Sequence, residues 1–205
     1  MRIFIGIPIP DSVRSKIWDC ADAIKMQNET AAKAVSNFRW VDSRCYHITL
    51  LFIGEAQPEK VARIRKKIRE IELPPAFRVD LGPIGRFPPR KGPPRVLFAA
   101  LKSGAEGCIS IYRKVSIDFE EFAERKEFVP HITLARAKKR TARTARSESR
   151  TSGSATGSTN ALPIEQLFSG RFDVTRIVLY ESKLGSDGPR YREIESYDLA
   201  LRGEL

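Results

Sequence analysis

Two histidines are the residues of this chain whose type and spacing point most directly to chemistry. They are the only histidines among the 205 residues, and each begins the tetrapeptide His-Ile-Thr-Leu, at His47 and again at His131. An imidazole has an unperturbed pKa of about 6.5, so it exchanges a proton near neutral pH. Two of them facing one cleft supply a general base and a general acid, each typically contributing about 10²–10⁴-fold in rate. The pair therefore predicts proton transfer in an in-line displacement.

The tetrapeptide also predicts how each histidine is presented. In a strand, successive side chains point to opposite faces, so His47 shares a face with Thr49, and His131 shares a face with Thr133. The isoleucine and leucine then anchor each strand to the core. Threonine hydroxyls and backbone N–H groups hold phosphoryl oxygens as negative charge builds. We expect Thr49 and Thr133 to bind phosphate.

Other basic and aromatic residues are candidates for binding phosphate or a base. Arg136 lies five residues after His131, nominally on the opposite strand face, but a bulge near the strand end would turn it into the cleft. Its guanidinium suits bidentate phosphate binding, although spacing alone favours a solvated arginine equally. Arg86, Phe87 and Arg90 lie in a proline-rich basic stretch that could stack a base and grip a phosphate. A proline-stiffened surface loop is the plainer interpretation of that stretch.

Plainer interpretations of the histidines are also available. A single strand histidine is more often a structural, hydrogen-bonded residue than a catalyst, but its repetition in the same tetrapeptide disfavours this. A metal site would be poorly ligated, because the histidines have no cysteine pair or acidic cluster near them. We therefore expect no metal and no cofactor. The chain also lacks the GxxxxGK[ST], GxGxxG and GxSxG motifs, so nothing in it suggests the use of ATP.

The elements that must position the two motifs repeat along the chain. A strand over 2–9, a helix from about residue 11 and the first motif are followed, in the same order, by a strand over 95–101, a helix and the second motif. Such a duplication implies two similar halves about a pseudo-twofold axis, with equivalent residues facing each other across the seam. Further patterns predict a helix opened by Pro58, a turn-rich loop over 82–94, and strands over 77–81, 172–182 and 191–201.

Composition is that of an ordinary globular protein, with 41% hydrophobic and 30% charged residues. No apolar run approaches the roughly 20 residues of a membrane-spanning helix, and the N-terminal stretch lacks the cleavage site of a secretory signal. The three cysteines are widely spaced and form neither a disulfide framework nor a zinc site, which suits the reducing cytoplasm. We expect a cytoplasmic monomer, because the duplication already supplies both halves.

The net charge of +11 makes a phosphate-bearing partner such as RNA plausible. Residues 138–161 alone hold six Lys or Arg against one Glu, and they contain no Val, Ile, Leu, Met, Cys or aromatic residue. Such a segment cannot bury enough apolar surface to offset its ordering entropy. We expect it to be a mobile loop of one bilobed domain that spans residues 1–205. A basic tether attracts nucleic acid without specificity, so charge alone does not identify the partner.

The motifs at residues 47–50 and 131–134 are similar to the paired HxT motifs of the 2H phosphoesterase superfamily. Within it, the chain resembles the RNA 2′,3′-cyclic phosphodiesterases, also called LigT-like proteins or 2′-5′ RNA ligases. The likeness covers nearly the whole chain, through residues 1–7, 39–41, 51–54, 95–98, 128–136 and 177–182. The 138–161 segment departs from the pattern as an enlarged loop.

The resemblance implies an α+β fold of two lobes, each an antiparallel sheet backed by helices, with both motifs lining a central groove. It also implies metal-independent hydrolysis of 2′,3′-cyclic phosphate ends of RNA to 2′-phosphomonoesters. By motif order, His131 resembles the proton acceptor that activates water, and His47 resembles the proton donor to the departing 3′ oxygen. The symmetry of the sequence itself gives no reason to choose between these roles.

Three other activities fit the same residues. The first is ATP-independent joining of a 2′,3′-cyclic phosphate to a 5′-hydroxyl, which gives a 2′-5′ linkage. The second is hydrolysis of small cyclic phosphates, such as ADP-ribose cyclic phosphate. The third is a non-catalytic RNA-binding module, whose binding would collapse with salt and would survive loss of both histidines. The sequence leaves these alternatives open.

Overall fold

The computed structural model describes residues 1–26, 36–89, 93–122, 127–138, 170–185 and 188–200. Two sequence predictions fall on other residues. The expected mobile loop lies outside the described residues from residue 139 onward, and so does the candidate base-binding residue Arg90.

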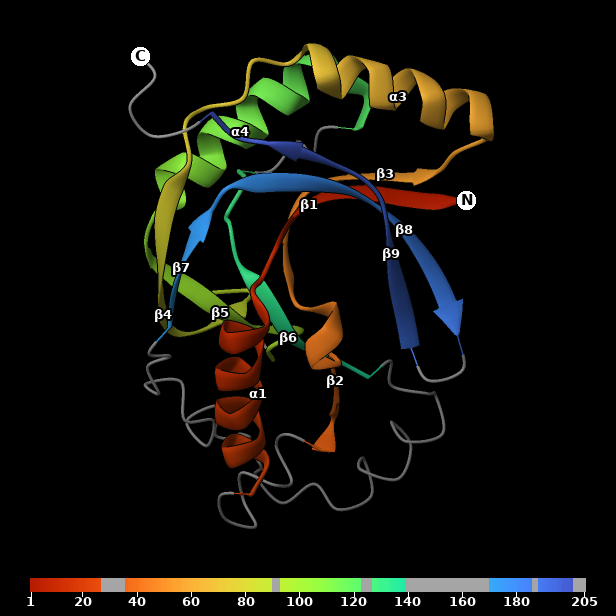
Figure 1. Cartoon of the computed structure of the whole chain (residues 1–205). Coiled ribbons are helices and arrows are strands. Elements are labelled where there is room, and N and C mark those ends of the chain that lie inside the picture. The colour runs from red at the N-terminus through yellow and green to blue at the C-terminus, as the bar shows by residue number, and fades with distance from the viewer. Residues whose placement is uncertain (27–35, 90–92, 123–126, 139–169, 186–187, 201–205) are drawn as a thin grey trace.

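An antiparallel sheet forms the body of the molecule (Figure 1). In the described part of the chain its strands follow the order β7-β4-β5-β6-β3-β1-β8-β9, and β2 pairs with β6. The strands are β1 (Arg2–Pro8), β2 (Phe38–Trp40), β3 (His47–Glu55), β4 (Phe77–Phe87), β5 (Val96–Ser103), β6 (Ile132–Ala137), β7 (Arg171–Val174), β8 (Arg176–Gly185) and β9 (Gly188–Asp198).

The sheet consists of two halves that meet at one residue pair, Ile48 of β3 with Ile132 of β6. Strands β3, β1, β8 and β9 form the half that carries His47, and we call it the His47 half. Strands β7, β4, β5 and β6, with β2, form the His131 half. The predicted α+β fold is confirmed, and the two expected sheets are halves of one continuous ladder.

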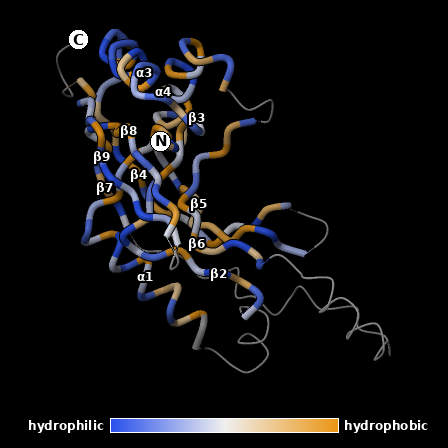
Figure 2. The backbone as a smooth tube through the Cα atoms, turned by 90° about the vertical axis from the view of Figure 1, so that its right-hand side faces the viewer, coloured by the Kyte–Doolittle hydropathy of each residue, from blue (hydrophilic) through white to orange (hydrophobic). Residues whose placement is uncertain are grey.

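Three helices cover the sheet, namely α1 (Asp11–Met26), α3 (Pro58–Glu70) and α4 (Ala105–Asp118), and there are two short 3₁₀ turns, η1 (Ser43–Cys45) and η2 (Glu120–Phe122), within the described residues. As their periodicity predicts, α3 and α4 each bury one apolar stripe. Figure 2 shows the rest of α3 to be largely hydrophilic. Helices α3 and α4 lie together at one end of the molecule, whereas α1 lies at the other (Figure 1).

The chain order repeats as the duplication predicts, but the two halves of the chain are interlaced in the sheet. Elements β1, α1 and β3 are followed in the same order by β5, α4 and β6. Strand β4 pairs with β5 in the His131 half, while β8 pairs with β1 in the His47 half. The strand predicted over 172–182 is therefore interrupted at Thr175, where the chain passes from β7 in one half to β8 in the other.

The prediction of a turn-rich loop over 82–94 is wrong for residues 82–87, which continue β4 as far as Phe87. Register shifts against β5 before Leu81 and before Ile84 accommodate Pro83, whose side chain is exposed. Proline is tolerated at such irregularities because it has no N–H to contribute to the ladder. Pairing with β5 thus outweighs the local glycine and proline signals.

Candidate active site

Both histidines are held by the same hydrogen bond. His47 opens β3 and His131 directly precedes β6. In each ring Nδ1 faces the backbone carbonyl two residues earlier, that of Cys45 at 2.8 Å and that of Val129 at 2.7 Å. A carbonyl oxygen only accepts, so Nδ1 carries the proton and donates it in both rings. In each neutral imidazole Nε2 is therefore the nitrogen that can accept a proton.

The seam between the halves brings the two motifs together. Because β3 and β6 are antiparallel and Ile48 faces Ile132, His47 lies toward Thr133 and Thr49 lies toward His131. Facing residues in such ladders have Cα atoms roughly 4.5–5.5 Å apart. The charge of His131 also contributes to lowering the pKa of His47, so the two rings interact electrostatically. The backbone register thus brings the four motif residues to one seam between the halves.

A β-bulge occurs at the same place in both motifs. In the pairing of β1 with β3, Leu50 has no partner residue on β1. In the pairing of β5 with β6, Leu134 likewise has no partner residue on β5. Both are the fourth residue of the tetrapeptide. An extra residue reverses the alternation of side chains beyond it. In each strand the leucine and the residue after it, Leu51 or Ala135, are accordingly both buried.

Beyond the bulges, Arg136 and Phe52 occupy equivalent positions, each five residues after its histidine. The reversed alternation returns both to the face that carries the histidines and threonines. The bulge that the spacing of Arg136 requires is therefore present. Its charge contributes to the lowered pKa of His47, and it opposes the rise that burial causes in the pKa of Tyr191, so it lies close to the first motif.

Phe52 was not among the predicted site residues. Its side chain is 43% exposed, unusually high for a phenylalanine in a sheet, and the Arg2 guanidinium lies over its ring at 4.7 Å from the centroid. The signal that could have found it is the repeat itself, because the duplication pairs Phe52 with Arg136.

The surroundings of His47 disfavour its protonated form. The pKa of His47 is lowered to about 4, chiefly by burial and also by the charges of His131 and Arg136, whereas the hydrogen bond to the Cys45 carbonyl acts in the opposite direction. In the neutral ring with its proton on Nδ1, Nε2 accepts a hydrogen bond from the Thr49 hydroxyl at 2.9 Å. A bound phosphate would offset the charge of Arg136, which is one of the influences that lower this pKa.

Aromatic rings support both imidazoles. In the His47 half, the His47 ring lies 4.7 Å from Phe4 and 5.1 Å from Tyr191 between centroids. In the His131 half, the His131 ring lies 5.0 Å from Phe98 and 5.2 Å from Phe87. These contacts restrict the motion of each ring, so they help to fix where Nε2 points.

Two of the predicted base-binding residues lie on β4. Phe87 stacks on Phe98 at 4.4 Å and meets His131 edge-on, so the structure gives it a supporting contact with the second motif. The Arg86 Nε donates to the carbonyl of Pro88 at 3.2 Å. Base binding by Arg86 and Phe87 stays a prediction.

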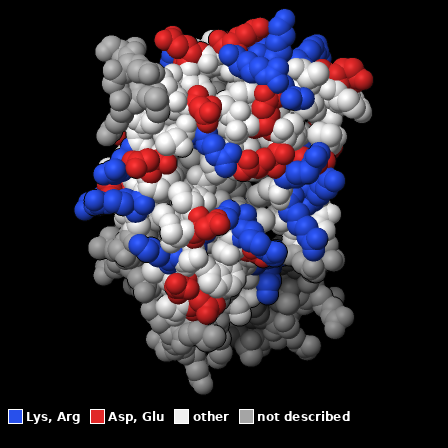
Figure 3. Space-filling view, in the orientation of Figure 1, with Lys and Arg blue, Asp and Glu red and all other residues white. Residues whose placement is uncertain are grey.

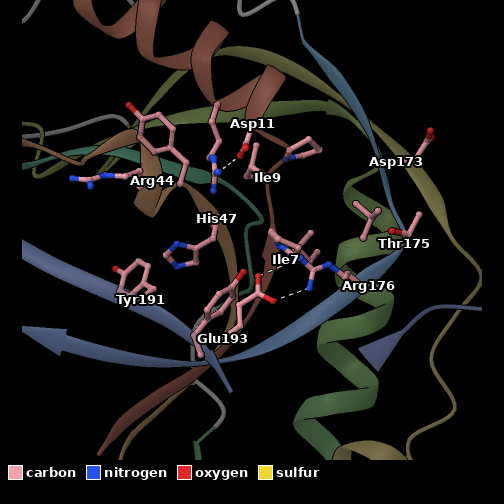
Figure 4. Close-up of a pocket in the computed structure, with 16 residues that line it drawn as sticks. Ile7, Ile9, Asp11, Arg44, His47, Asp173, Thr175, Arg176, Tyr191 and Glu193 are labelled. Carbon is pink, nitrogen blue, oxygen red and sulfur yellow. Dashed lines mark hydrogen bonds and ion pairs between the residues drawn. The ribbon is translucent and has the colours of Figure 1, made fainter. Parts of the chain in front are cut away.

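A pocket of about 360 Å³ opens beside His47 (Figure 4). Its walls come from the end of β1, the start of α1, and from η1, β7, β8 and β9. Three arginines in its wall each pair with a carboxylate, namely Arg14 with Asp11, Arg44 with Asp42, and Arg176 with Glu193. The pocket is therefore rich in charge without being strongly basic.

The net positive charge is not gathered on the face seen in Figure 3, where basic and acidic side chains are interspersed. Within the residues that the structure describes, no three His, Cys, Asp or Glu side chains are grouped so that they could hold a metal ion. None of the helices in that part of the chain is long and apolar enough to cross a membrane.

Comparison with known proteins gives a consistent set of similarities. Residues 19–98 match the family model described as LigT like Phosphoesterase. An Archaeoglobus fulgidus protein named RNA 2′,3′-cyclic phosphodiesterase is 32% identical over 143 residues, which cover 68% of this chain and 74% of that protein. A Thermus thermophilus protein of the same name is 29% identical, with coverage of 100% of this chain and 92% of that protein.

Solved structures share the fold over nearly the whole chain. The crystal structure of TT0787 of Thermus thermophilus has a TM-score of 0.73 and 26% identity, covering 98% of this chain and all of that one. Escherichia coli LigT complexed with 3′-AMP has a TM-score of 0.71 and 22% identity, covering 97% of both chains. The second likeness supports the fold alone.

Proposed function

Since the chain belongs to the family of LigT-like phosphoesterases, we propose that it hydrolyses 2′,3′-cyclic phosphate ends of RNA to 2′-phosphomonoesters. Curated relatives carry the name RNA 2′,3′-cyclic phosphodiesterase, and the chain is accordingly a phosphodiesterase. The observation that carries the proposal is the equivalent presentation of two imidazoles, one from each half, each with Nδ1 donating a hydrogen bond to a backbone carbonyl.

In the proposed reaction, a water oxygen attacks the phosphorus and gives its proton to Nε2 of His131. The bond from phosphorus to the 3′ oxygen breaks in line with the attack, and Nε2 of His47 gives its proton to that oxygen. The bond to the 2′ oxygen stays, so the product is a 2′-phosphomonoester. The resemblance assigns these two roles, because the hydrogen bonds that orient the rings are the same for both histidines.

The lowered pKa of His47 has to be reconciled with its role as proton donor. A ring with a pKa of about 4 is neutral at pH 7. An anionic phosphate beside it offsets the charge of Arg136, and a nearby opposite charge favours the imidazolium. His47 would therefore gain its proton as substrate binds, so that the acid is formed only where there is a phosphate to receive it.

The remaining site residues have supporting roles in the proposal. Thr49 and Thr133 flank the seam and would hold phosphoryl oxygens as charge builds on them. Arg136 would bind the same group through its planar guanidinium. Phe52, exposed on the same face, would stack the terminal base, since a base presents a π-face to any aromatic ring. One chain supplies both motifs, so we also propose that it acts as a monomer, without a metal ion, in the cytoplasm.

The test is hydrolysis of adenosine 2′,3′-cyclic phosphate by EDTA-treated enzyme, with the product isomer identified by chromatography. We expect 2′-AMP, and we expect His47→Ala and His131→Ala each to lower kcat by about 10²-fold or more with an unchanged circular dichroism spectrum. Arg63→Gln, an exposed change on α3, serves as the control and should match the wild type. Turnover lost on chelation, 3′-AMP as product, or full activity in either histidine variant would contradict the proposal.

The same reagents separate the alternative functions. Matching RNA halves, one with a 2′,3′-cyclic phosphate and one with a 5′-hydroxyl, reveal a ligase by a joined product that forms without ATP. A larger kcat/KM on ADP-ribose cyclic phosphate than on an oligonucleotide would indicate a small-molecule enzyme. RNA binding that persists in both histidine variants, with no turnover by the wild type, would indicate a binding module.

A further inference from the structure

Arg39 of β2 stands directly opposite Arg136 of β6. Backbone hydrogen bonds on either side fix this register, from the N–H of Val41 to the carbonyl of Leu134 and from the N–H of Lys138 to the carbonyl of Asn37, both at 2.8 Å. Directly paired residues of antiparallel strands lie on the same face of the sheet, with Cβ atoms about 4.5–5.5 Å apart. Arg39 therefore shares the face on which the bulge places Arg136.

The neighbours of Arg39 hold it in this orientation. Phe38 is buried in a small apolar cluster with Leu97 and Ala135, and Trp40 packs against the same cluster. Because side chains alternate along a strand, anchoring residues 38 and 40 on one face directs Arg39 to the other. Its side chain is exposed there.

Two like charges directly opposite each other destabilise a strand pair. Among the described residues, no carboxylate forms an ion pair with either Arg39 or Arg136, although many other arginines of the chain have such partners. The facing like charges therefore carry a cost that no carboxylate offsets within the part of the chain that the structure describes. An anionic ligand with more than one phosphate would remove this cost, because each guanidinium could then face its own phosphate.

The two arginines lie at different distances from the first motif. Arg136 lies near enough to His47 to affect its pKa, whereas Arg39 is not among the groups that act on that ring. Under the proposed function the cyclic phosphate occupies the seam and is bound by Arg136. Arg39 is then one strand farther from the reacting phosphorus, on the same face.

We propose that Arg39 binds the phosphodiester that links the terminal nucleotide to the rest of the RNA, so that the enzyme prefers oligonucleotide ends to cyclic mononucleotides. This inference rests on the proposed function and deepens it by naming a polymer-specific subsite. An exposed guanidinium on this face suits this task, because contacts to phosphate position nucleic acids without reading their sequence.

The test compares three substrates that differ in one group. They are adenosine 2′,3′-cyclic phosphate, the dinucleotide ApA ending in a 2′,3′-cyclic phosphate, and the same dinucleotide with an uncharged methylphosphonate linkage. For Arg39→Gln we expect the loss of kcat/KM on the charged dinucleotide to exceed the loss on the mononucleotide by about tenfold. The loss should appear mainly in KM, since a hydrogen bond to a charged group contributes about this much to binding affinity. With the methylphosphonate dinucleotide, the wild type should lose its preference for a dinucleotide over the mononucleotide. Arg39→Gln should then lower kcat/KM on that substrate little further.

Arg63→Gln removes the same charge from α3, away from the groove, and should leave the kcat/KM for all three substrates unchanged. Equal losses on the mononucleotide and the dinucleotide would overturn the inference, because Arg39 would then act on the reacting phosphate. An unchanged kcat/KM of Arg39→Gln on the charged dinucleotide would overturn it as well. So would an equally large loss of kcat/KM on the methylphosphonate substrate. Failure of the proposed function is distinguished by a wild-type enzyme that turns over none of the three.

Discussion

His47 is a single side chain on which burial, two cations and one hydrogen bond act at the same time. Burial is the largest influence and, with the charges of His131 and Arg136, it favours the neutral ring. The carbonyl of Cys45 holds the proton on Nδ1, so the tautomer is set independently of the charge. The residue thus has a fixed orientation and an adjustable protonation state, which is what a group that meets an anionic substrate needs.

The influence of Arg136 on this ring can be measured directly. A neighbouring cation opposes the imidazolium, so Arg136→Gln should raise the pKa of His47 from about 4 toward the ordinary value of 6.5. The chain has only two histidines, so a ¹H–¹⁵N titration of the imidazoles resolves both. Arg63→Gln should leave the His47 titration in place. An unchanged or lowered pKa in Arg136→Gln would show that the arginine points away from the first motif.

The strands beside the two motifs support the imidazoles in different ways. Opposite the motif threonine, β1 carries Gly6 and β5 carries Phe98. A Cβ on Gly6 would lie 3.0 Å from the carbonyl oxygen of Ile48 and 3.3 Å from Cδ2 of His47. In the other half, a Cβ on Gly85 would overlap the ring of Phe98, which in turn contacts His131. Gly6 thus leaves room for the His47 ring, and Gly85 leaves room for the Phe98 ring that contacts His131.

This difference predicts two complementary variants. Gly6→Ala should shift the imidazole resonances of His47 and spare those of His131, while Gly85→Ala should do the reverse. Overpacking costs roughly 1–3 kcal/mol of stability, and a misplaced catalytic group loses up to about 10²-fold in rate. The two-histidine ¹H–¹⁵N spectrum and kcat/KM on the cyclic mononucleotide provide the readouts. If each variant disturbed the resonances of both histidines equally, the two imidazoles would not be supported independently, and the prediction would be wrong.

The sequence predicts those elements whose pattern is local, and it misses those that depend on contacts with other strands. The histidine strands, the helices and the duplication follow from local periodicity and a repeated tetrapeptide. Residues 82–87 do not, because their glycines and prolines favour a turn and only pairing with β5 makes them a strand. Phe52 and Arg39 were likewise outside prediction as site residues. Their positions depend on bulges and on cross-strand partners, which are tertiary features.

The stability of the whole molecule should depend on pH through His47. Its pKa is about 4 in the folded protein, against an ordinary value of 6.5 that applies when the chain is unfolded. Between these values the unfolded state binds more protons, so the contribution is fully present above pH 6.5 and is lost as the pH falls toward 4. His47→Gln should reduce the slope of unfolding free energy against pH in this window, by at most one proton. Urea titrations across that window measure it, and parallel curves for the two proteins would refute it.

Strands β8 and β9 close the His47 half, so the first motif depends on residues near the other end of the chain. Tyr191 meets the His47 ring edge-on, and Pro189 accepts the hydrogen bond from the thiol of Cys45, whose carbonyl orients that ring. Ribosomes deliver the N-terminus first, at about 5–20 residues per second. A nascent chain therefore displays both histidines for some time before it can build the surroundings of the first. We therefore expect the first motif to acquire its complete surroundings only after β9 has been translated.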